Sequence, residues 1–258
     1  LQGREDLIAK YQAKKEKLMA GDEEEFGPEE QVWPQGRERR VRIQQCHAVY
    51  GAMVEAMDEQ IGRVLDKLEQ LGIADNTAVI LMSDNGGLST SEGSPTSNLP
   101  LRGGKGWLYE GGIRTPMIIR WPGRVDAGTE TSFPVQSTDF FPTMLNMAGA
   151  AEMPGVILDG VSLVPILTGA GNLSRDALFW HFPHYHGSGN RPSGAVRMGR
   201  WKLLEWFEDG AVELYDLEED PGERVDLSRD RPDVLGDLLS RLEAWRVDVG
   251  ANMPRVEP

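Results

Sequence analysis

A short apolar run that ends in a polar cluster constrains the fold of this chain most. Residues Ala78–Met82 are continuously apolar, and they follow apolar positions that recur at steps of three and four between residues 43 and 71. The periodic positions predict a helix that ends at Gly72, and the run is typical of a strand buried on both faces of a parallel sheet. The cluster Ser83–Gly87 follows directly. Since ligands of open α/β sheets bind at the carboxyl ends of strands, the cluster is predicted to lie at a ligand site.

Asp84 and Asn85 place a carboxylate and an amide oxygen on adjacent residues of this cluster. Oxygen ligands of this kind suit Ca²⁺ or Mg²⁺, but either cation needs about six or more ligands, so other segments must supply the rest. The competing interpretation is a plain turn, because Asn-Gly is a common turn and Asp a common cap.

A glycine-rich segment, Leu101–Gly112, begins eighteen residues after Ser83 and contains Lys105. Its glycines let the backbone approach a ligand closely, and a lysine offers a compact charge for a tetrahedral anion. Together with the oxygen ligands, this pattern indicates a divalent cation that holds an anionic group of a substrate. The alternative is that Lys105 is an ordinary solvated lysine of a loop.

Charge and cysteine content exclude several classes of protein. The net charge of -14 argues against wholesale binding of nucleic acid, and the longest apolar runs are too short to span a membrane. Cys46 is the only cysteine, which excludes an internal disulfide and a Cys-rich zinc site. We expect Cys46 to lie inert on the apolar face of the helix. The chain begins with Leu1, which suggests a processed or truncated product.

The character of the sequence changes near residue 172. Short β-like runs, separated by turn residues, cover residues 177–182, 194–198, 201–207 and 212–215. They predict an antiparallel sheet, and a helical pattern that opens at Asp230 predicts a terminal helix. We therefore expect two domains, residues 1–171 and residues 172–258.

Three of the four histidines lie together in the segment Phe179–His186. They could bind zinc, contact a substrate or simply belong to an aromatic loop. Zinc would need a fourth ligand that the sequence does not provide nearby.

With these motifs in order, the chain resembles the C-terminal part of a formylglycine-dependent sulfatase. The resemblance rests on residues 77–87, 101–121 and 213–223, and it extends over roughly residues 43–250. It implies a partial alkaline-phosphatase-like α/β sandwich with a mostly parallel sheet. A smaller α+β C-terminal domain, with an antiparallel sheet and a terminal helix, would follow.

The resemblance also implies roles for particular residues. Asp84 and Asn85 match two calcium ligands, and Lys105 matches a lysine that contacts the sulfate ester. The family's Cys-x-Pro/Ser-x-Arg motif, whose Cys becomes formylglycine, is absent, because His47 and Ala48 follow Cys46. The N-terminal Asp pair and the His-x-Pro motif are absent too. We therefore expect an inactive fragment whose partner is the missing N-terminal segment of the same enzyme, in a periplasmic or secreted protein.

The expected substrate is a sulfate ester, and the histidine segment favours a sulfated carbohydrate. Tryptophan stacks on sugar C–H groups and imidazole bonds hydroxyls, so His181 and His184 are predicted to read the sugar. Arg197 is predicted to contact a second anionic group. The alternatives are another alkaline-phosphatase-like hydrolase, such as a phosphodiesterase or phosphonate monoester hydrolase, and a non-catalytic binding module. The former usually uses two transition metals with added His and Asp ligands.

Overall fold

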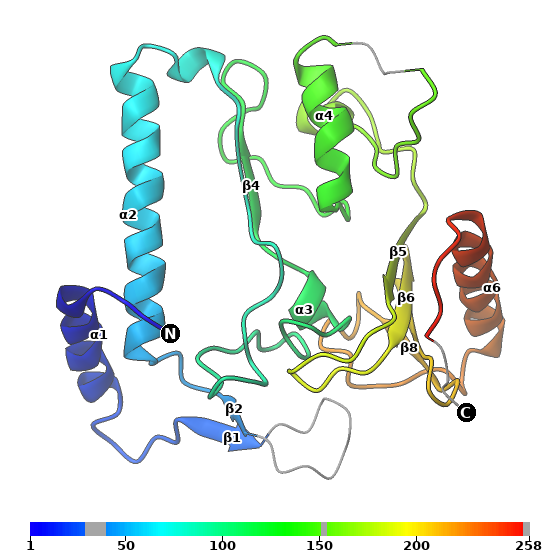
Figure 1. Ribbon diagram of the computed structural model, residues 1–258, viewed down its shortest axis with the longest axis horizontal. Coiled ribbons are helices and arrows are strands. Elements are labelled where there is room, and N and C mark those ends of the chain that lie inside the picture. The colour runs from blue at the N-terminus through cyan, green and yellow to red at the C-terminus, as the bar shows by residue number, and fades with distance from the viewer. Residues whose placement is uncertain (29–39, 151–153, 255–258) are drawn as a thin grey trace. The chain divides into compact units, whose positions relative to one another are not determined.

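The computed structural model describes residues 1–28, 40–150 and 154–254 (Figure 1). The chain divides into two compact units. The first comprises Leu1–Lys67, Met82–Met117 and Phe179–Pro258, and the second comprises Leu68–Leu81 and Ile118–Leu178. The expected domain boundary between residues 171 and 172 stays a prediction.

The N-terminal part of the first unit contains two helices and a small antiparallel sheet. These are α1 (Glu5–Leu18), β1 (Phe26–Pro28), β2 (Arg40–Arg42) and α2 (Ala48–Gln70). Gly72, with a φ of 66°, follows α2 as expected. The prediction that the helix includes Cys46 is wrong, because the chain pairs as β2 and turns before α2 begins. Cys46 is nevertheless buried, and a guanidinium nitrogen of Arg42 lies 3.5 Å from its sulfur.

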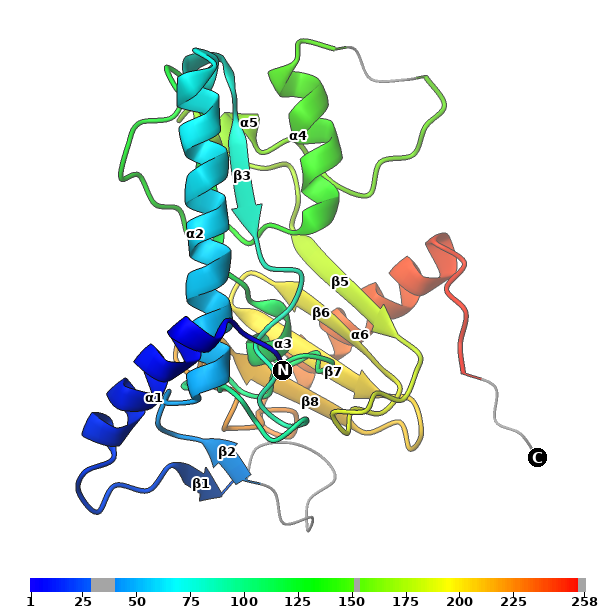
Figure 2. The same cartoon turned by 60° about the vertical axis from the view of Figure 1, so that its left-hand side comes forward.

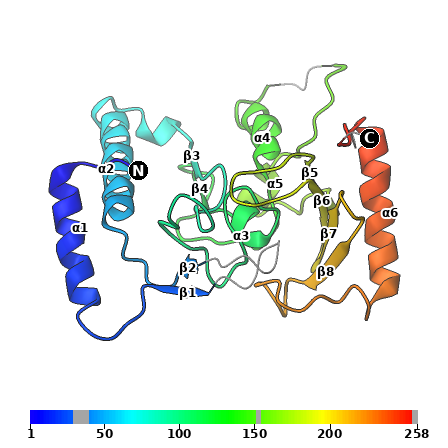
Figure 3. The same cartoon turned by 60° about the horizontal axis from the view of Figure 1, so that its bottom comes forward.

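The C-terminal part of the first unit is a four-stranded sheet with a helix on one face (Figures 2 and 3). The strands, in spatial order, are β5 (Ala177–Phe182), β6 (Ser193–Met198), β7 (Trp201–Trp206) and β8 (Val212–Asp216), and the helix is α6 (Pro232–Asp248). β7 pairs antiparallel with both β6 and β8. The predicted antiparallel sheet and terminal helix are therefore confirmed.

Side chains of β7 alternate between the two faces of this sheet, as the period of a strand requires. Glu205 faces α6, where its carboxylate lies 2.6 Å from the guanidinium of Arg246. Leu204 and Trp206 face the other side, where they join a buried cluster with Trp107 and Tyr109 of the glycine-rich segment. The core of the first unit thus packs the glycine-rich segment directly against the C-terminal sheet.

The second unit contains most of a two-stranded sheet and two short helices. These elements are β3 (Val79–Met82), β4 (Met117–Arg120), α4 (Phe140–Met147) and α5 (Val164–Leu167), with 3₁₀ turns at Ala74–Asn76 and Ser137–Asp139. The predicted strand at residues 78–82 is confirmed, but its burial on both faces is wrong, since Leu81 is 41% exposed. Within the described residues β3 has only β4 as a sheet neighbour.

Asp139 fixes the start of α4. Its fully buried carboxylate accepts hydrogen bonds from the backbone N–H of Gln136 at 2.9 Å and from Arg175 at 2.6 Å. Among the residues that the structure describes, no helix is both long and apolar enough to cross a membrane.

Candidate functional site

Asp84 and Asn85 lie just beyond the end of β3 at Met82, where the sequence pattern placed them. The Ser83 hydroxyl donates a hydrogen bond to the Asn85 carbonyl oxygen at 2.9 Å and closes the turn. Asp84 is exposed and Asn85 is half-buried. Within residues 1–28, 40–150 and 154–254, neither side chain has a polar partner. The side-chain oxygens of both residues therefore remain available to a ligand.

Backbone hydrogen bonds join this turn to the glycine-rich segment. Gly86 N–H donates to Gly112 O at 2.9 Å, and Lys105 N–H donates to Gly87 O at 3.0 Å. Both segments belong to the same compact unit. The two polar clusters that the sequence separates by eighteen residues thus form one site.

Asn98 ties the two segments together a second time. Its amide accepts a hydrogen bond from Gly87 N–H at 2.9 Å and donates to Gly87 O at 2.9 Å and to Gly103 O at 3.0 Å. Sequence reasoning missed this residue, because nothing local distinguishes an asparagine that bridges two loops from one in solvent.

The glycines of the site are required by close packing of backbone. A Cβ atom at Gly86 would overlap the carbonyl group of Gly111, and one at Gly104 would overlap the carbonyl oxygen of Gly87. Gly106 has a φ of 87°, a conformation that side chains disfavour. We expected these glycines to admit a ligand, but in the structure they admit the neighbouring segment.

Lys105 presents its side chain to solvent from this packed segment. Its ammonium has no hydrogen bond or ion pair within the described part of the chain. The neighbouring Arg102, by contrast, lies 3.8 Å from the ring centre of Tyr109 and donates to the Tyr215 hydroxyl at 2.7 Å. Lys105 therefore offers an available positive charge on a segment whose backbone is hydrogen-bonded to the turn that carries Asp84 and Asn85.

Of the three clustered histidines, His186 lies against the Lys105 segment. A Cβ at Gly106 would overlap its ring, and its Nδ1 lies 3.1 Å from Ser188 N and 2.8 Å from Ser188 Oγ. Sequence reasoning singled out His181 and His184 instead, because spacing alone does not tell which of three close histidines meets another segment.

The other proposed substrate contacts lie as follows. His181 Nε2 is 2.8 Å from Asn252 O, in the segment that follows α6. His184 is exposed, with its ring edge-on to Phe182. Arg197 lies 3.7 Å from a carboxylate oxygen of Glu110. Of these three residues, His184 is therefore the one whose ring nitrogens have no hydrogen-bond partner among the described residues.

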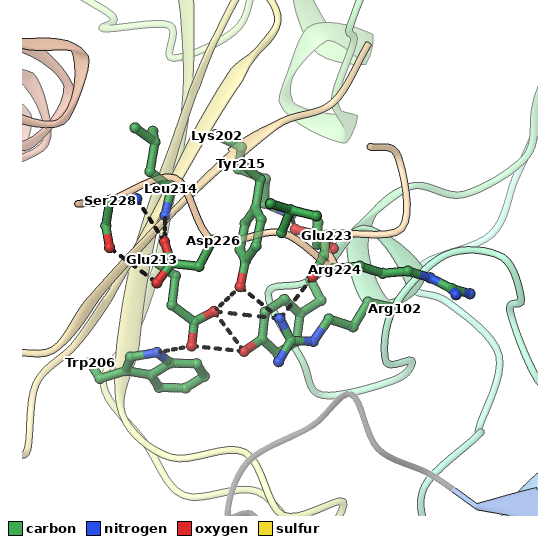
Figure 4. Close-up of polar contacts among 12 residues, drawn as sticks. Arg102, Lys202, Trp206, Glu213, Leu214, Tyr215, Glu223, Arg224, Asp226 and Ser228 are labelled. Atoms are coloured by element: carbon green, nitrogen blue, oxygen red, sulfur yellow. Dashed lines mark hydrogen bonds and ion pairs between the residues drawn. The ribbon is translucent and has the colours of Figure 1, made fainter. Parts of the chain in front are cut away.

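A buried charge cluster, the Glu110–Lys202–Glu223 cluster, lies between the glycine-rich segment and the C-terminal sheet. Figure 4 labels two of its members, Lys202 and Glu223. Lys202 Nζ is 3.0 Å from a Glu110 oxygen and 2.7 Å from a Glu223 oxygen, and none of the three residues is more than 1% exposed. Burial and repulsion by Glu110 raise the pKa of Glu223 to about 7. Attraction by Lys202 acts in the opposite direction but is outweighed. For Glu110 burial acts to raise the pKa, but the combined attractions of Lys202, Arg197 and Arg114 outweigh it, so the pKa is lowered.

A second polar cluster surrounds Glu213 (Figure 4). The Glu213 carboxylate accepts hydrogen bonds from Tyr109 at 2.8 Å, from Trp206 at 3.0 Å and from Tyr215 at 2.7 Å. It also lies 3.7 Å from Arg102. Sequence reasoning missed both clusters, because charged residues normally face solvent and no local pattern marks these as buried.

Comparison with family models gives two matches. The model described as sulfatase matches residues 5–150, and the model described as the C-terminal part of N-sulphoglucosamine sulphohydrolase matches residues 104–247. Within the described residues there is no group of three or more His, Cys, Asp or Glu side chains that could hold a metal ion.

Similar curated proteins are longer than this chain. A sulfatase of Formosa agariphila is 37% identical over 223 residues, which cover 78% of this chain and 40% of that protein. Arylsulfatase A of Homo sapiens is 32% identical over 200 residues, which cover 69% of this chain and 38% of that protein. The chain thus spans about two fifths of the length of these relatives.

Solved structures with a similar fold include Ps i-CgsB, with a TM-score of 0.70 and 28% identity over 95% of this chain and 46% of that one. BT4656, in complex with its substrate D-glucosamine-2-N,6-O-disulfate, has a TM-score of 0.67 and 29% identity over 80% of this chain and 41% of that one. A phosphonate monoester hydrolase from Silicibacter pomeroyi has a TM-score of 0.60 and 26% identity over 78% of this chain and 40% of that one.

Proposed function

The chain belongs to the sulfatase family, and we propose that it supplies the cation- and sulfate-binding part of an enzyme that hydrolyses sulfate esters. The observation that carries this proposal is the pair of backbone hydrogen bonds that join the Asp84–Gly87 turn to the Lys105 segment. These bonds hold against each other the two segments that carry the proposed oxygen ligands and the proposed sulfate-binding lysine.

Asp84 and Asn85 fit a share of a calcium shell. Carboxylate and amide oxygens are ligands that Ca²⁺ prefers, and the two side chains have no competing polar partner in the described residues. Bound there, Ca²⁺ supplies positive charge that attracts the oxygens of a sulfate group. Further ligands come from residues outside this chain, so the chain alone is expected to bind calcium weakly.

Lys105 holds the sulfate group through its exposed ammonium. Its backbone is held by hydrogen bonds to the neighbouring turn, and its positive charge would stabilise the negative charge of the reacting group. The nucleophile, a formylglycine in this family, would come from outside these 258 residues, whose one cysteine, Cys46, is buried and lacks the motif. The chain alone is therefore expected to be inactive.

A sulfated carbohydrate is the proposed class of substrate. Support comes from the similar structure of BT4656, which is in complex with a disulfated glucosamine. The exposed imidazole of His184 is suited to bond a sugar hydroxyl. His181 and Arg197 have partners within the chain, so a role for them in binding requires those contacts to open.

We propose that the complete enzyme forms an alkaline-phosphatase-like sandwich with a mostly parallel sheet, of which β3 and β4 are part. The similarity to a phosphonate monoester hydrolase keeps that activity as a second candidate. Rates with a sulfate ester and a phosphonate monoester of the same alcohol distinguish the two. A higher kcat/KM for the phosphonate would reject the sulfatase proposal.

The direct test uses the complete protein that contains this chain. Sulfate release from sulfated mono- and disaccharides and from 4-methylumbelliferyl sulfate is measured after chelation and after addition of Ca²⁺. We expect turnover that Ca²⁺ restores, and a His184→Ala variant that loses far more activity on the saccharide than on the aryl sulfate. Equal losses on both substrates would remove His184 from recognition.

A further inference from the structure

Glu223 combines complete burial with an unfavourable backbone conformation. It is 0% exposed, and its φ is 54°, in the left-handed region that residues other than glycine rarely adopt. Such a conformation costs on the order of 1–3 kcal/mol and persists only where the surrounding structure fixes it. The contacts that Glu223 makes must therefore offset this cost.

Glu223 contacts both ends of the segment that carries Lys105. Its backbone carbonyl accepts a hydrogen bond from Arg102 at 3.0 Å, three residues before Lys105 in the chain. Its side chain accepts one from Glu110 N–H at 2.7 Å, five residues after Lys105. Its other carboxylate oxygen lies 2.7 Å from Lys202 in β7, which anchors these contacts to the C-terminal sheet.

The segment between these anchors is closed on itself. Gly111 N–H donates to Arg102 O at 2.7 Å, and Trp107 N–H donates to Gly104 O at 3.0 Å. Fixing the two ends of a closed loop therefore fixes the residue between them, although Glu223 has no hydrogen bond or ion pair with Lys105.

We propose that Glu223 is a positioning residue that holds the Lys105 segment in the place that sulfate binding requires. This inference rests on the proposed function, because it assigns to Lys105 the sulfate group. A role in stability alone does not explain the arrangement, since well-packed apolar side chains of the same volume often stabilise a protein as much as a buried ion pair or more.

The first test is independent of activity. Hydrogen exchange is measured in the complete protein for wild type, Glu223→Gln and the control Glu219→Gln, which makes the same change at a side chain that is 81% exposed. In Glu223→Gln we expect the amides of Lys105 and Gly111 to exchange at least tenfold faster, while the amides of β7 keep their protection. Unchanged exchange in the segment, or the same increase in β7, would overturn the proposal.

The second test measures coupling to Lys105. In the complete enzyme, Glu223→Gln should lower kcat/KM for a sulfate ester at least tenfold per folded molecule, whereas Glu219→Gln should not. In a Lys105→Met background the Glu223→Gln change should have no further effect. Independent, additive losses would overturn the proposal.

The two tests separate the positioning role from the proposed function. If wild type hydrolyses no sulfate ester, the proposed function fails, and the exchange experiment still decides whether Glu223 holds the segment.

Discussion

Replacing Lys202 by methionine tests the Glu110–Lys202–Glu223 cluster most severely. The substitution keeps most of the volume of the side chain and removes the ammonium that lies within 3.0 Å of both carboxylates. Removing one partner of a buried ion pair usually costs about 3–5 kcal/mol, because the remaining charge is left without compensation. Glu110 keeps Arg197 at 3.7 Å, so the uncompensated group is chiefly Glu223. We expect a loss of about 3 kcal/mol at pH 8.

The loss should depend on pH with a definite sign. Glu223 takes up a proton more readily than an ordinary glutamate, and its neutral form no longer needs the ammonium. The destabilisation of Lys202→Met should therefore shrink as the pH falls from 8 to 5.

Urea unfolding, followed by the fluorescence of the buried Trp107 and Trp206, measures the free energy of unfolding of the complete protein. Lys67→Met, at an exposed lysine in the last turn of α2, is the matched control and should change it by less than about 0.5 kcal/mol. A loss below about 1 kcal/mol for Lys202→Met, or an equal loss at pH 5 and pH 8, would refute the reasoning.

Three further predictions concern single positions. The pKa of Glu223 is raised to about 7 from an ordinary 4.5, so between these pH values the folded protein holds a proton that the unfolded chain has released. The free energy of unfolding should therefore fall as the pH rises from 4.5 to 7, and urea titrations should show a smaller fall in Glu223→Gln. Gly86→Ala places a methyl group on the Gly111 carbonyl and should lower the free energy of unfolding by about 1–3 kcal/mol or more. Gly62→Ala, in open space on a helix, should raise it by about 0.5–1 kcal/mol, and thermal unfolding compares the two variants. Cys46 should react with a thiol reagent only when urea unfolds the protein, and rapid labelling of the native protein would contradict its burial.

Elements with a clear local pattern could be predicted from the sequence. The strands β6, β7 and β8 follow short β-like runs separated by turn residues, and the helix α6 follows apolar positions at steps of three and four. They form as expected. The strand β2 could not be predicted, because its Arg-Val-Arg sequence has no strand-like pattern and it forms by pairing with β1. The exposure of Leu81 was also unpredictable, since burial of a strand depends on neighbours that its own sequence does not specify.

The candidate site shows the same limit. Asp84, Asn85 and Lys105 could be singled out because their residue types suit a cation and an anion, but the hydrogen bonds that join their segments connect residues that are distant in the sequence. The roles of Glu223 and Lys202 could not be predicted at all. Each is an ordinary charged residue in the sequence, and only the tertiary structure brings one against the other in the core.

The most direct test of the central claim is the kcat/KM of the complete protein for a sulfate ester, compared between wild type and Lys105→Met. Because the exposed Lys105 ammonium is assigned to the sulfate group, the account predicts a fall of at least about a hundredfold, which corresponds to about 2.7 kcal/mol of transition-state stabilisation. The Lys67→Met control should retain wild-type activity. Wild-type turnover by Lys105→Met would contradict the account.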